Sequence, residues 1–264
     1  CEYNEFGKPV SFQYSNGIET NYIYYDSGSN FNRLHKIYTD PSSVFSVEYD
    51  YDNVGNITQR TDHNNSSYSE SYTYDELNRL VSAYSGVYGT KNYTYDSIGR
   101  IVRKDGQSYS YDDSSHVHAV TEKGGSTYSY DANGNMVNHN GASLSYNFND
   151  MMTSFGNRSY EYFGKSRVKK SEDGITTYYF FDNYEEKEEG GSVNSIKYYN
   201  AFGRKVAKRS DDEGLVFFHS DHLDSSTRVT DSSGNLIKHL GYKPFGSSSY
   251  EDGSMDITYR YTGK

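Results

Sequence analysis

A nine-residue pattern, Tyr-x-Tyr-Asp-x-x-Gly-(Arg/Asn)-(Ile/Leu/Met), recurs along this chain of 264 residues. Counting weaker copies, the second tyrosine of the pattern falls at positions 51, 74, 95, 111, 130, 146 and 162, so the repeat is 16 to 23 residues long. A four-stranded propeller blade needs roughly 40 residues, whereas two strands of about five residues and two turns fit this period. The chain is therefore predicted to be a series of β-hairpins. The four clearest copies have their second tyrosine at Tyr51, Tyr74, Tyr95 and Tyr130.

Each repeat carries its own turn signal in the Asp-x-x-Gly step. Aspartate at the first position of a type I turn can accept the backbone N–H two residues on, and glycine adopts the left-handed conformation that closes a three-residue hairpin with a bulge. One copy has Asn78 in place of glycine, and asparagine tolerates positive φ better than most residues. The substitution supports the turn assignment. The predicted turn residues are Asp52 and Gly55, Asp75 and Asn78, Asp96 and Gly99, and Asp131 and Gly134.

A second, shorter turn separates one repeat from the next, for example at Asp105-Gly106, Gly124-Gly125 and Asn140-Gly141. Most of these dipeptides are typical of two-residue hairpin turns. Because two turn types alternate and no helix-period apolar pattern of useful length is present, the fold class is predicted to be all-β. The predicted topology is an antiparallel meander of hairpins.

The composition limits the kind of core that such a meander can have. Only 33% of the residues are hydrophobic, but 31 are tyrosine and 13 are phenylalanine. Tyrosine can bury its ring faces while its hydroxyl stays in water, so a thick aliphatic core and a conventional α/β enzyme fold are excluded. Strand alternation places both tyrosines of a repeat on one face and Thr, Ser or Asp on the other. We therefore expect a single-layer wall, which sheet twist would coil around an enclosed space.

Charge and hydropathy exclude two classes of partner. The net charge is −10, which argues against nucleic acid, since that partner requires clustered Lys and Arg. No transmembrane segment is expected, because no stretch approaches the roughly 18 apolar residues that a membrane helix needs.

The single cysteine, Cys1, allows no intrachain disulfide. The start at Cys1-Glu2-Tyr3 suggests a segment of a longer chain.

The character of the sequence changes near residue 211. Residues 1–210 are predicted to be repeat strip, and residues 211–264 a second segment that begins with a more apolar strand. This segment carries an ordered series of motifs: His219-Ser220-Asp221-His222-Leu223-Asp224-Ser225, then Thr230-Asp231-Ser232-Ser233-Gly234, then Tyr242-Lys243-Pro244-Phe245-Gly246, and last Tyr259-Arg260-Tyr261-Thr262-Gly263-Lys264.

These repeats and the ordered series resemble the RHS/YD-repeat family, and the block from His219 resembles the start of its RHS-associated core. By this resemblance, residues 211–264 are the truncated start of the shell-closing segment. The resemblance covers nearly the whole chain. It implies a spiral β-strip that forms part of a hollow shell, as in bacterial polymorphic toxins, insecticidal toxin complexes and animal teneurins. In the toxins the shell holds a C-terminal effector, and in many members a self-cleaving protease region follows the Tyr-x-Tyr-Thr-Gly step. This chain stops at Lys264, before both. One departure from the family pattern is Asp224, where glycine is usual; because Asp tolerates a left-handed turn, only local geometry is affected.

The resemblance implies a structural, non-enzymatic segment of a secreted or cell-surface bacterial protein. Its partner would be the C-terminal toxin or effector domain of the same parent chain, with no cofactor. The first alternative is an adhesion or carbohydrate-binding module that contacts cell-surface glycans through tyrosine rings. Trp, the best ring platform for a sugar, is missing from the sequence.

The second alternative is a metal-dependent hydrolase centred on His219, Asp221 and His222. On a strand, His219 and Asp221 share a face and His222 points away, so a single ion would need a turn there. A metal site also requires three or four ligands with further support, and no second cluster is visible. We therefore expect these groups to hydrogen-bond within the strip, with no catalytic, cofactor or metal residues.

Overall fold

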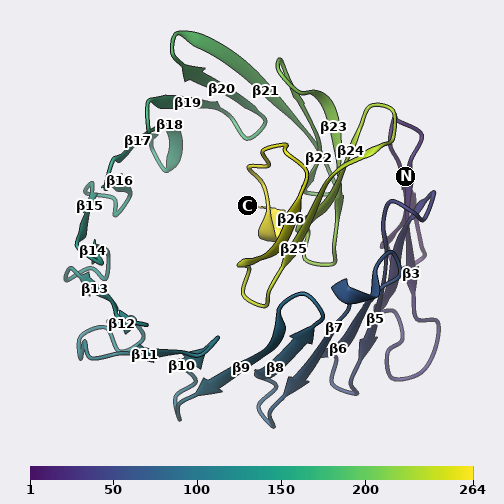
Figure 1. The fold of residues 1–264 in the computed structure, drawn as a ribbon, viewed down its shortest axis with the longest axis horizontal. Coiled ribbons are helices and arrows are strands. Elements are labelled where there is room, and N and C mark those ends of the chain that lie inside the picture. Colours follow the sequence, from purple (N-terminus) through teal and green to yellow (C-terminus); the bar gives the residue numbers. More distant parts are fainter. Residues whose placement is uncertain (264) are drawn as a thin grey trace. The chain divides into compact units, whose positions relative to one another are not determined.

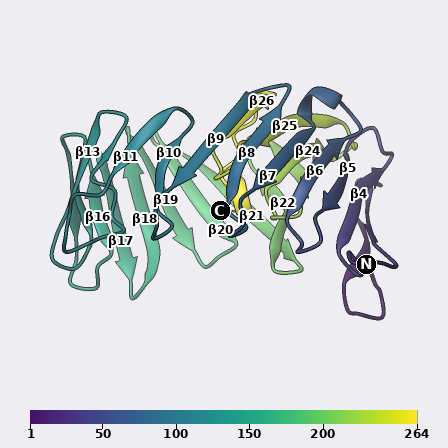
Figure 2. The same cartoon turned by 90° about the horizontal axis from the view of Figure 1, so that it is seen from below.

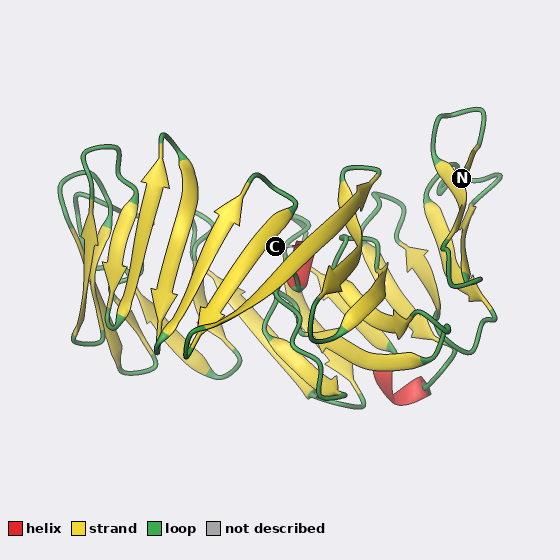
Figure 3. Ribbon diagram, turned by 90° about the horizontal axis from the view of Figure 1, so that it is seen from above, coloured by secondary structure: helices red, strands yellow, loops and turns green. Residues whose placement is uncertain are grey.

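The computed structural model describes residues 1–263, and Lys264, the last residue of the predicted segment 211–264, lies outside the described residues. Twenty-six strands belong to one antiparallel sheet, and neighbours along the chain pair with each other. Figure 3 shows the strands in yellow and, in red, two short 3-10 helices, η1 (Ser66–Tyr68) and η2 (Tyr261–Gly263). The described residues contain no α-helix. The predicted all-β antiparallel meander is therefore confirmed.

The chain divides into two compact units, which are described separately. Unit 1 comprises Cys1–Lys91, Tyr199–Arg209 and Glu213–Lys264, and unit 2 comprises Asn92–Tyr198 and Ser210–Asp212. The division of the sequence at residue 210 follows its motifs and stays a prediction.

The first eight strands lie in unit 1, and β4 to β8 are visible side by side in Figure 2. Their bounds are β1 (Glu2–Tyr3), β2 (Pro9–Gln13), β3 (Glu19–Tyr24), β4 (Leu34–Asp40), β5 (Ser46–Tyr51), β6 (Ile57–Asp62), β7 (Glu70–Tyr74) and β8 (Leu80–Ser85). The last strands of unit 1 are β22 (Arg204–Ser210, up to Arg209), β23 (Gly214–Ser220), β24 (Ser226–Asp231), β25 (Leu236–Tyr242) and β26 (Ser248–Asp252). Two further strands cross the unit boundaries as β22 does, β9 (Gly89–Tyr95) and β21 (Ser192–Ala201).

The strands of unit 2 follow each other in chain order (Figure 1). They are β10 (Ile101–Lys104), β11 (Gln107–Ser110), β12 (Glu122–Lys123), β13 (Ser126–Tyr130), β14 (Met136–His139), β15 (Ala142–Tyr146), β16 (Met152–Phe155), β17 (Arg158–Phe163), β18 (Ser166–Glu172), β19 (Ile175–Phe180) and β20 (Tyr184–Glu189).

The aspartate of each repeat organises the turn that follows it. Asp52 Oδ1 accepts the backbone N–H groups of Val54, Gly55 and Asn56 at 3.1, 2.7 and 2.8 Å. Gly55 has φ +103°, and Asn78 has φ +59° at the same place in the next repeat. Positive φ is costly for residues with a Cβ, except for asparagine and aspartate. The Asp-x-x-(Gly/Asn) step thus fixes where each hairpin bends.

The residue after the turn adds a further contact to the same carboxylate. In the fourth clear copy the Asn135 side-chain amide donates to Asp131 Oδ2 at 3.1 Å, while the Asn135 backbone N–H donates to Oδ1 at 2.9 Å. These hydrogen bonds lower the pKa of Asp131, because they favour the charged carboxylate. In the copies with arginine at this position, Arg79 and Arg100 form ion pairs with Asp75 and Asp96.

The second tyrosine of the repeat joins its hairpin to the preceding one. Neighbouring hairpins pair over few residues next to the connection between them. The strands β6 and β7, which are joined by the loop that contains η1, share only the pairs Gln59↔Ser71 and Arg60↔Glu70. Beyond these pairs the strands separate, and the Tyr74 hydroxyl donates to the Ile57 carbonyl at 2.8 Å. The same bridge occurs at 2.7 to 2.9 Å in six other places: Tyr24 to Pro9, Tyr51 to Leu34, Tyr111 to Ile101, Tyr130 to Val120, Tyr162 to Met152, and Tyr242 to Ser226.

The sequence led us to expect the tyrosine hydroxyls in water, and for these seven tyrosines this expectation is wrong. They instead satisfy backbone carbonyls at the point where the sheet ladder between hairpins stops. A polar backbone group at a half-buried position needs a partner, and a phenol reaches across the gap between the separating strands. The repeat therefore requires tyrosine at this position, because phenylalanine has no hydroxyl to donate.

The sequence also led us to expect a single-layer wall, and for unit 1 this is wrong because the unit has a filled core. One face of β2 to β5 packs against residues of β22 and β23, and the Tyr14 hydroxyl donates to the Phe218 carbonyl at 2.8 Å. Alternation within the repeats could not indicate this contact, since the covering strands come from the far end of the chain. The buried cluster comprises Tyr14, Ile18, Tyr22, Ile37, Val44, Phe45, Val47, Tyr49, Val206, Ala207 and Phe217.

Buried apolar side chains are sparser in unit 2, where the described apolar residues below 10% exposure are Tyr93, Tyr160, Ile196 and Tyr198. No helix within residues 1–263 is long and apolar enough to span a bilayer.

Replacing Tyr74 with Phe tests the tyrosine bridge. Tyr74→Phe removes the hydroxyl that satisfies the Ile57 carbonyl and should lower the free energy of unfolding by about 1 kcal/mol. The control is Tyr84→Phe on the neighbouring strand β8, where the side chain is 53% exposed. Denaturant unfolding of the two variants measures the difference, and equal stabilities would show that the bridge contributes nothing.

Candidate functional site: the 219–246 motif and its contacts

His219 lies on β23 in the interior of unit 1 and has 0% exposure. Its ring is 4.8 Å from the ring of Tyr14, between centroids, and its Nε2 is 3.0 Å from Thr230 Oγ1. Burial, aided by the positive charge of Arg228, lowers the pKa of His219 to about 3. The side chain is therefore a neutral, packed imidazole that no solvent-borne substrate reaches.

Asp221 performs the same task as the aspartate of each repeat. Its Oδ1 accepts the backbone N–H groups of Leu223 and Ser225, both at 2.9 Å. Asp224, which stands where glycine is usual, has φ +63° and accepts a hydrogen bond from Arg204 Nη1 at 2.9 Å. The motif thus begins with an Asp-x-x-Gly-type turn in which aspartate holds the left-handed position.

His222 packs against an early repeat of unit 1. Its ring lies 4.7 Å from that of Tyr49, between centroids, and burial lowers its pKa. Its Nδ1 is buried without a hydrogen-bond partner. The described residues contain no group of three His, Cys, Asp or Glu side chains placed to hold a metal ion. His219, Asp221 and His222 therefore have three separate environments: a core, a turn and the wall of a cavity.

The rest of the motif forms two further turns. Asp231 Oδ1 accepts the N–H groups of Ser233 and Asn235, and Gly234 has φ +85°. In the turn after Pro244, Phe245 and Gly246 both have positive φ, at +70° and +92°. A Cβ on Gly246 would lie 2.5 Å from the Tyr261 ring. Glycine is required there by both the backbone conformation and the contact with that ring.

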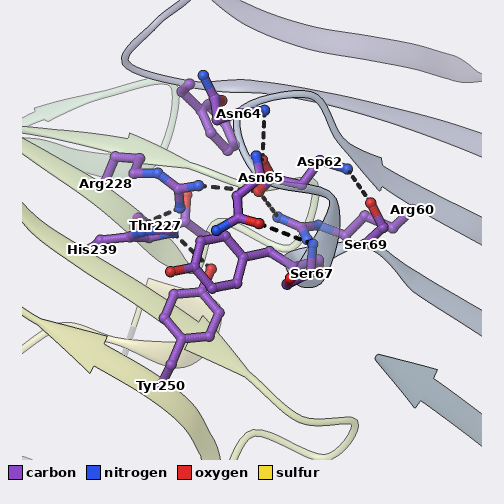
Figure 4. Close-up of polar contacts among 12 residues, drawn as sticks. Arg60, Asp62, Asn64, Asn65, Ser67, Ser69, Thr227, Arg228, His239 and Tyr250 are labelled. Atoms are coloured by element: carbon purple, nitrogen blue, oxygen red, sulfur yellow. Dashed lines mark hydrogen bonds and ion pairs between the residues drawn. The ribbon is translucent and has the colours of Figure 1, made fainter. Parts of the chain in front are cut away.

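An ion pair that the sequence analysis missed connects the motif region to the first repeats. Arg228 Nη2 donates to Asp62 Oδ2 at 3.1 Å, and the two residues are only 1% and 2% exposed. Figure 4 shows Arg228 beside the loop that begins at Asp62. Burial lowers the pKa of Arg228. The one signal in the sequence is a lone arginine within the strand segment Ser226-Thr227-Arg228-Val229.

Asp62 also holds the loop before η1, so its carboxylate has a full set of partners. Its Oδ1 accepts the backbone N–H groups of Asn64 and Asn65 at 2.9 and 3.1 Å, while its own N–H donates to Ser69 Oγ at 3.0 Å. A buried charge is tolerated only when it is paired and hydrogen-bonded, and Asp62 meets both conditions (Figure 4).

Aromatic rings complete the contact between η1 and the last strands. Tyr68 of η1 stacks on Tyr250 of β26 with ring centroids 4.1 Å apart, and the Tyr250 hydroxyl lies 2.7 Å from His239 Nε2. Burial lowers the pKa of His239 to about 3, so its imidazole is neutral and Nε2 shares a hydrogen bond with the Tyr250 hydroxyl. Together with the Asp62–Arg228 pair, these contacts fix β24, β25 and β26 to the loop between β6 and β7.

The geometry defines a class of protein: a β-meander of tyrosine–aspartate hairpins whose last strands pack back on the first. The family model described as the teneurin YD-shell matches residues 3–262, and the chain belongs to this family. The resemblance drawn from the sequence is therefore confirmed.

Solved structures of toxin proteins share the fold. The chain is 18% identical to a chain in the crystal structure of TcdB2-TccC3-Cdc42, with a TM-score of 0.80 over 100% of this chain and 16% of that one. It is also 18% identical to a chain in the Photorhabdus luminescens Tc holotoxin pore with mutated TccC3, with a TM-score of 0.81 over 99% of this chain and 16% of that one. In the crystal structure of TcdB2-TccC3 the matching chain is 18% identical, with a TM-score of 0.79 over 100% of this chain and 17% of that one.

The chain thus spans about one sixth of the length of these structures' matching chains. A search of curated proteins finds none that matches the sequence.

The Asp62–Arg228 pair gives a stability prediction. Asp62→Asn leaves the buried guanidinium without its countercharge and should lower the free energy of unfolding by about 3–5 kcal/mol. The exposed pair Lys169–Glu161 supplies the control, since Glu161→Gln should cost less than about 1 kcal/mol. In the double variant Asp62→Asn with Arg228→Met, part of the loss should be recovered, because the unpaired buried charge is gone while the asparagine oxygen can still accept from the N–H groups of Asn64 and Asn65. A loss as small for Asp62→Asn as for Glu161→Gln, in denaturant unfolding, would contradict this role.

The buried histidines give a pH prediction. His219 has a pKa of about 3 in the folded chain, against 6.5 as its ordinary value. Between these values the unfolded chain binds a proton that the folded chain does not, so stability falls as the pH falls below 6.5. The slope from this one residue is about 1.4 kcal/mol per pH unit. His219→Gln should reduce the slope of unfolding free energy against pH by about one proton. His118→Gln, at an exposed position, is the control, and identical slopes for all three proteins would refute the assignment.

Proposed function

We propose that this chain is a structural segment of the β-shell of a bacterial RHS/YD-repeat toxin, secreted or at the cell surface. In this proposal the shell encloses a C-terminal toxic effector of the same parent chain. The observation that carries the proposal is the match of the YD-shell family model to residues 3–262. Its fold likeness to TcdB2-TccC3 structures adds support, and one of these is described as lacking a hypervariable C-terminal region.

The aspartate, tyrosine and histidine side chains that could take part in catalysis make structural contacts in this chain, which supports a non-enzymatic role. The repeated aspartates accept backbone N–H groups in turns, as Asp52 and Asp221 do. The repeated tyrosines donate to backbone carbonyls, as Tyr162 does to Met152. His219 is packed in the core.

The two predicted segments take different parts in this proposal. Residues 1–210 would supply repeat strip, and residues 211–264 would begin the RHS-associated core that closes the shell. The buried Asp62–Arg228 pair supports this division of roles, because it ties a strand of the second segment to a strand of the first.

Limited proteolysis of the parent protein tests the proposal. An enclosed effector should resist a protease that digests the same effector when it is expressed alone. Asp62→Asn in the parent should speed cleavage of the effector, because the contact that fixes β24 to β6 is weakened, whereas Glu161→Gln should not. Cleavage of the effector at the rate of the free domain in the unmodified parent would overturn the proposal.

A further inference from the structure

A cavity of about 320 Å³ lies within unit 1, between the strands β6 to β8 and the segments that follow β23 and β25. It has the size of a small-molecule site, which is roughly 300–1,000 Å³. Neither the turns nor the bridges of the repeat require such a space. Its wall is formed largely by aromatic rings, those of Tyr68, Tyr72, Tyr74, Tyr242, Tyr250 and Tyr261.

Glu70 and His222 are two of the polar residues on the wall of this cavity. Glu70 is 9% exposed, and its carboxylate accepts a hydrogen bond from the Tyr88 hydroxyl at 2.7 Å. His222 lines the cavity, while its Nδ1 is buried within the protein without a hydrogen-bond partner. Burial raises the pKa of Glu70 against the attraction of Arg60, and it lowers the pKa of His222.

The charges around the cavity balance one another. The Arg60 guanidinium lies 3.6 Å from Glu70 Oε2 and 3.8 Å from Asp62 Oδ2, and Arg60 Nη1 donates to the Tyr68 carbonyl at 3.1 Å. On the other wall, Asp221 and Lys243 carry opposite charges. An ionic ligand would meet no uncompensated partner here, and it would lose its hydration against aromatic walls.

We propose that this cavity binds a neutral sugar of one or two rings. The apolar faces of a pyranose match tyrosine rings, and its hydroxyl groups both donate and accept hydrogen bonds. One hydroxyl group would donate to the Glu70 carboxylate, which lies on the cavity wall. This inference is independent of the shell role, because it concerns a cavity inside unit 1.

The experiment is saturation-transfer difference NMR on this chain with methyl β-D-glucopyranoside, D-galactose, N-acetyl-D-glucosamine and maltose as probes. Glucuronate and glucosamine at the same concentration are the charged comparators. We expect saturation transfer from tyrosine ring protons to at least one neutral sugar, with a dissociation constant on the order of 1 mM, and much weaker transfer to the charged pair.

Two variants locate the binding. His222→Phe replaces a polar ring of the cavity wall with a larger apolar ring that fills part of the cavity, and should weaken binding by about tenfold or more. Leu223→Trp narrows the cavity from a residue that is 44% exposed, so it tests the site without disturbing the interior. Tyr199→Ala, at an exposed ring outside the cavity, is the control and should bind like the unmodified chain.

Three results would overturn the inference. The first is no transfer to any neutral sugar, and the second is equal transfer to the charged pair. The third is binding that survives both His222→Phe and Leu223→Trp. Unfolding midpoints of the variants, measured in parallel, distinguish loss of the site from loss of the fold. None of these results bears on the shell role, which the proteolysis of the parent tests separately.

Discussion

The hydrogen bond from the second tyrosine of a repeat to a backbone carbonyl of the preceding hairpin is the interaction on which the repeated structure depends. Within a hairpin the strands share three to five residue pairs, as in β13–β14 and β5–β6, but neighbouring hairpins share only two in places such as β6–β7 and β16–β17. The tyrosine bridges the separated part. A chain poor in aliphatic residues thereby gains cohesion between hairpins, because each phenol contributes a buried ring and a hydrogen bond together.

A second constraint acts over long distances in the sequence. Asp62 and Arg228 are 166 residues apart and form a buried pair, while Tyr14 and Phe218 meet in the core of the same unit. Such contacts cost more chain entropy to form than local turns. We infer that the repeats form local hairpins on their own, and that the charged pair and the aromatic core select how the last strands pack on the first.

What could be predicted from the sequence follows the same division between local and distant contacts. The Asp-x-x-Gly turns are local, so the meander and even the positive φ of Asn78 and Asp224 follow from residue types. The single-layer wall was wrong for unit 1, and the tyrosine hydroxyls were wrongly placed in water. Both errors concern contacts that no spacing within one repeat encodes. Arg228 and the cavity beside His222 escaped notice for the same reason, since their partners come from a different part of the chain.

The central claim is that these hairpins serve as a wall and that their polar side chains build it. An electron cryo-microscopy structure of the parent protein tests this most directly. The account predicts that residues 3–262 form part of a β-layer that bounds a cavity, with density of the effector inside. A parent particle in which these strands bound no cavity, or in which the effector lies outside them, would contradict it.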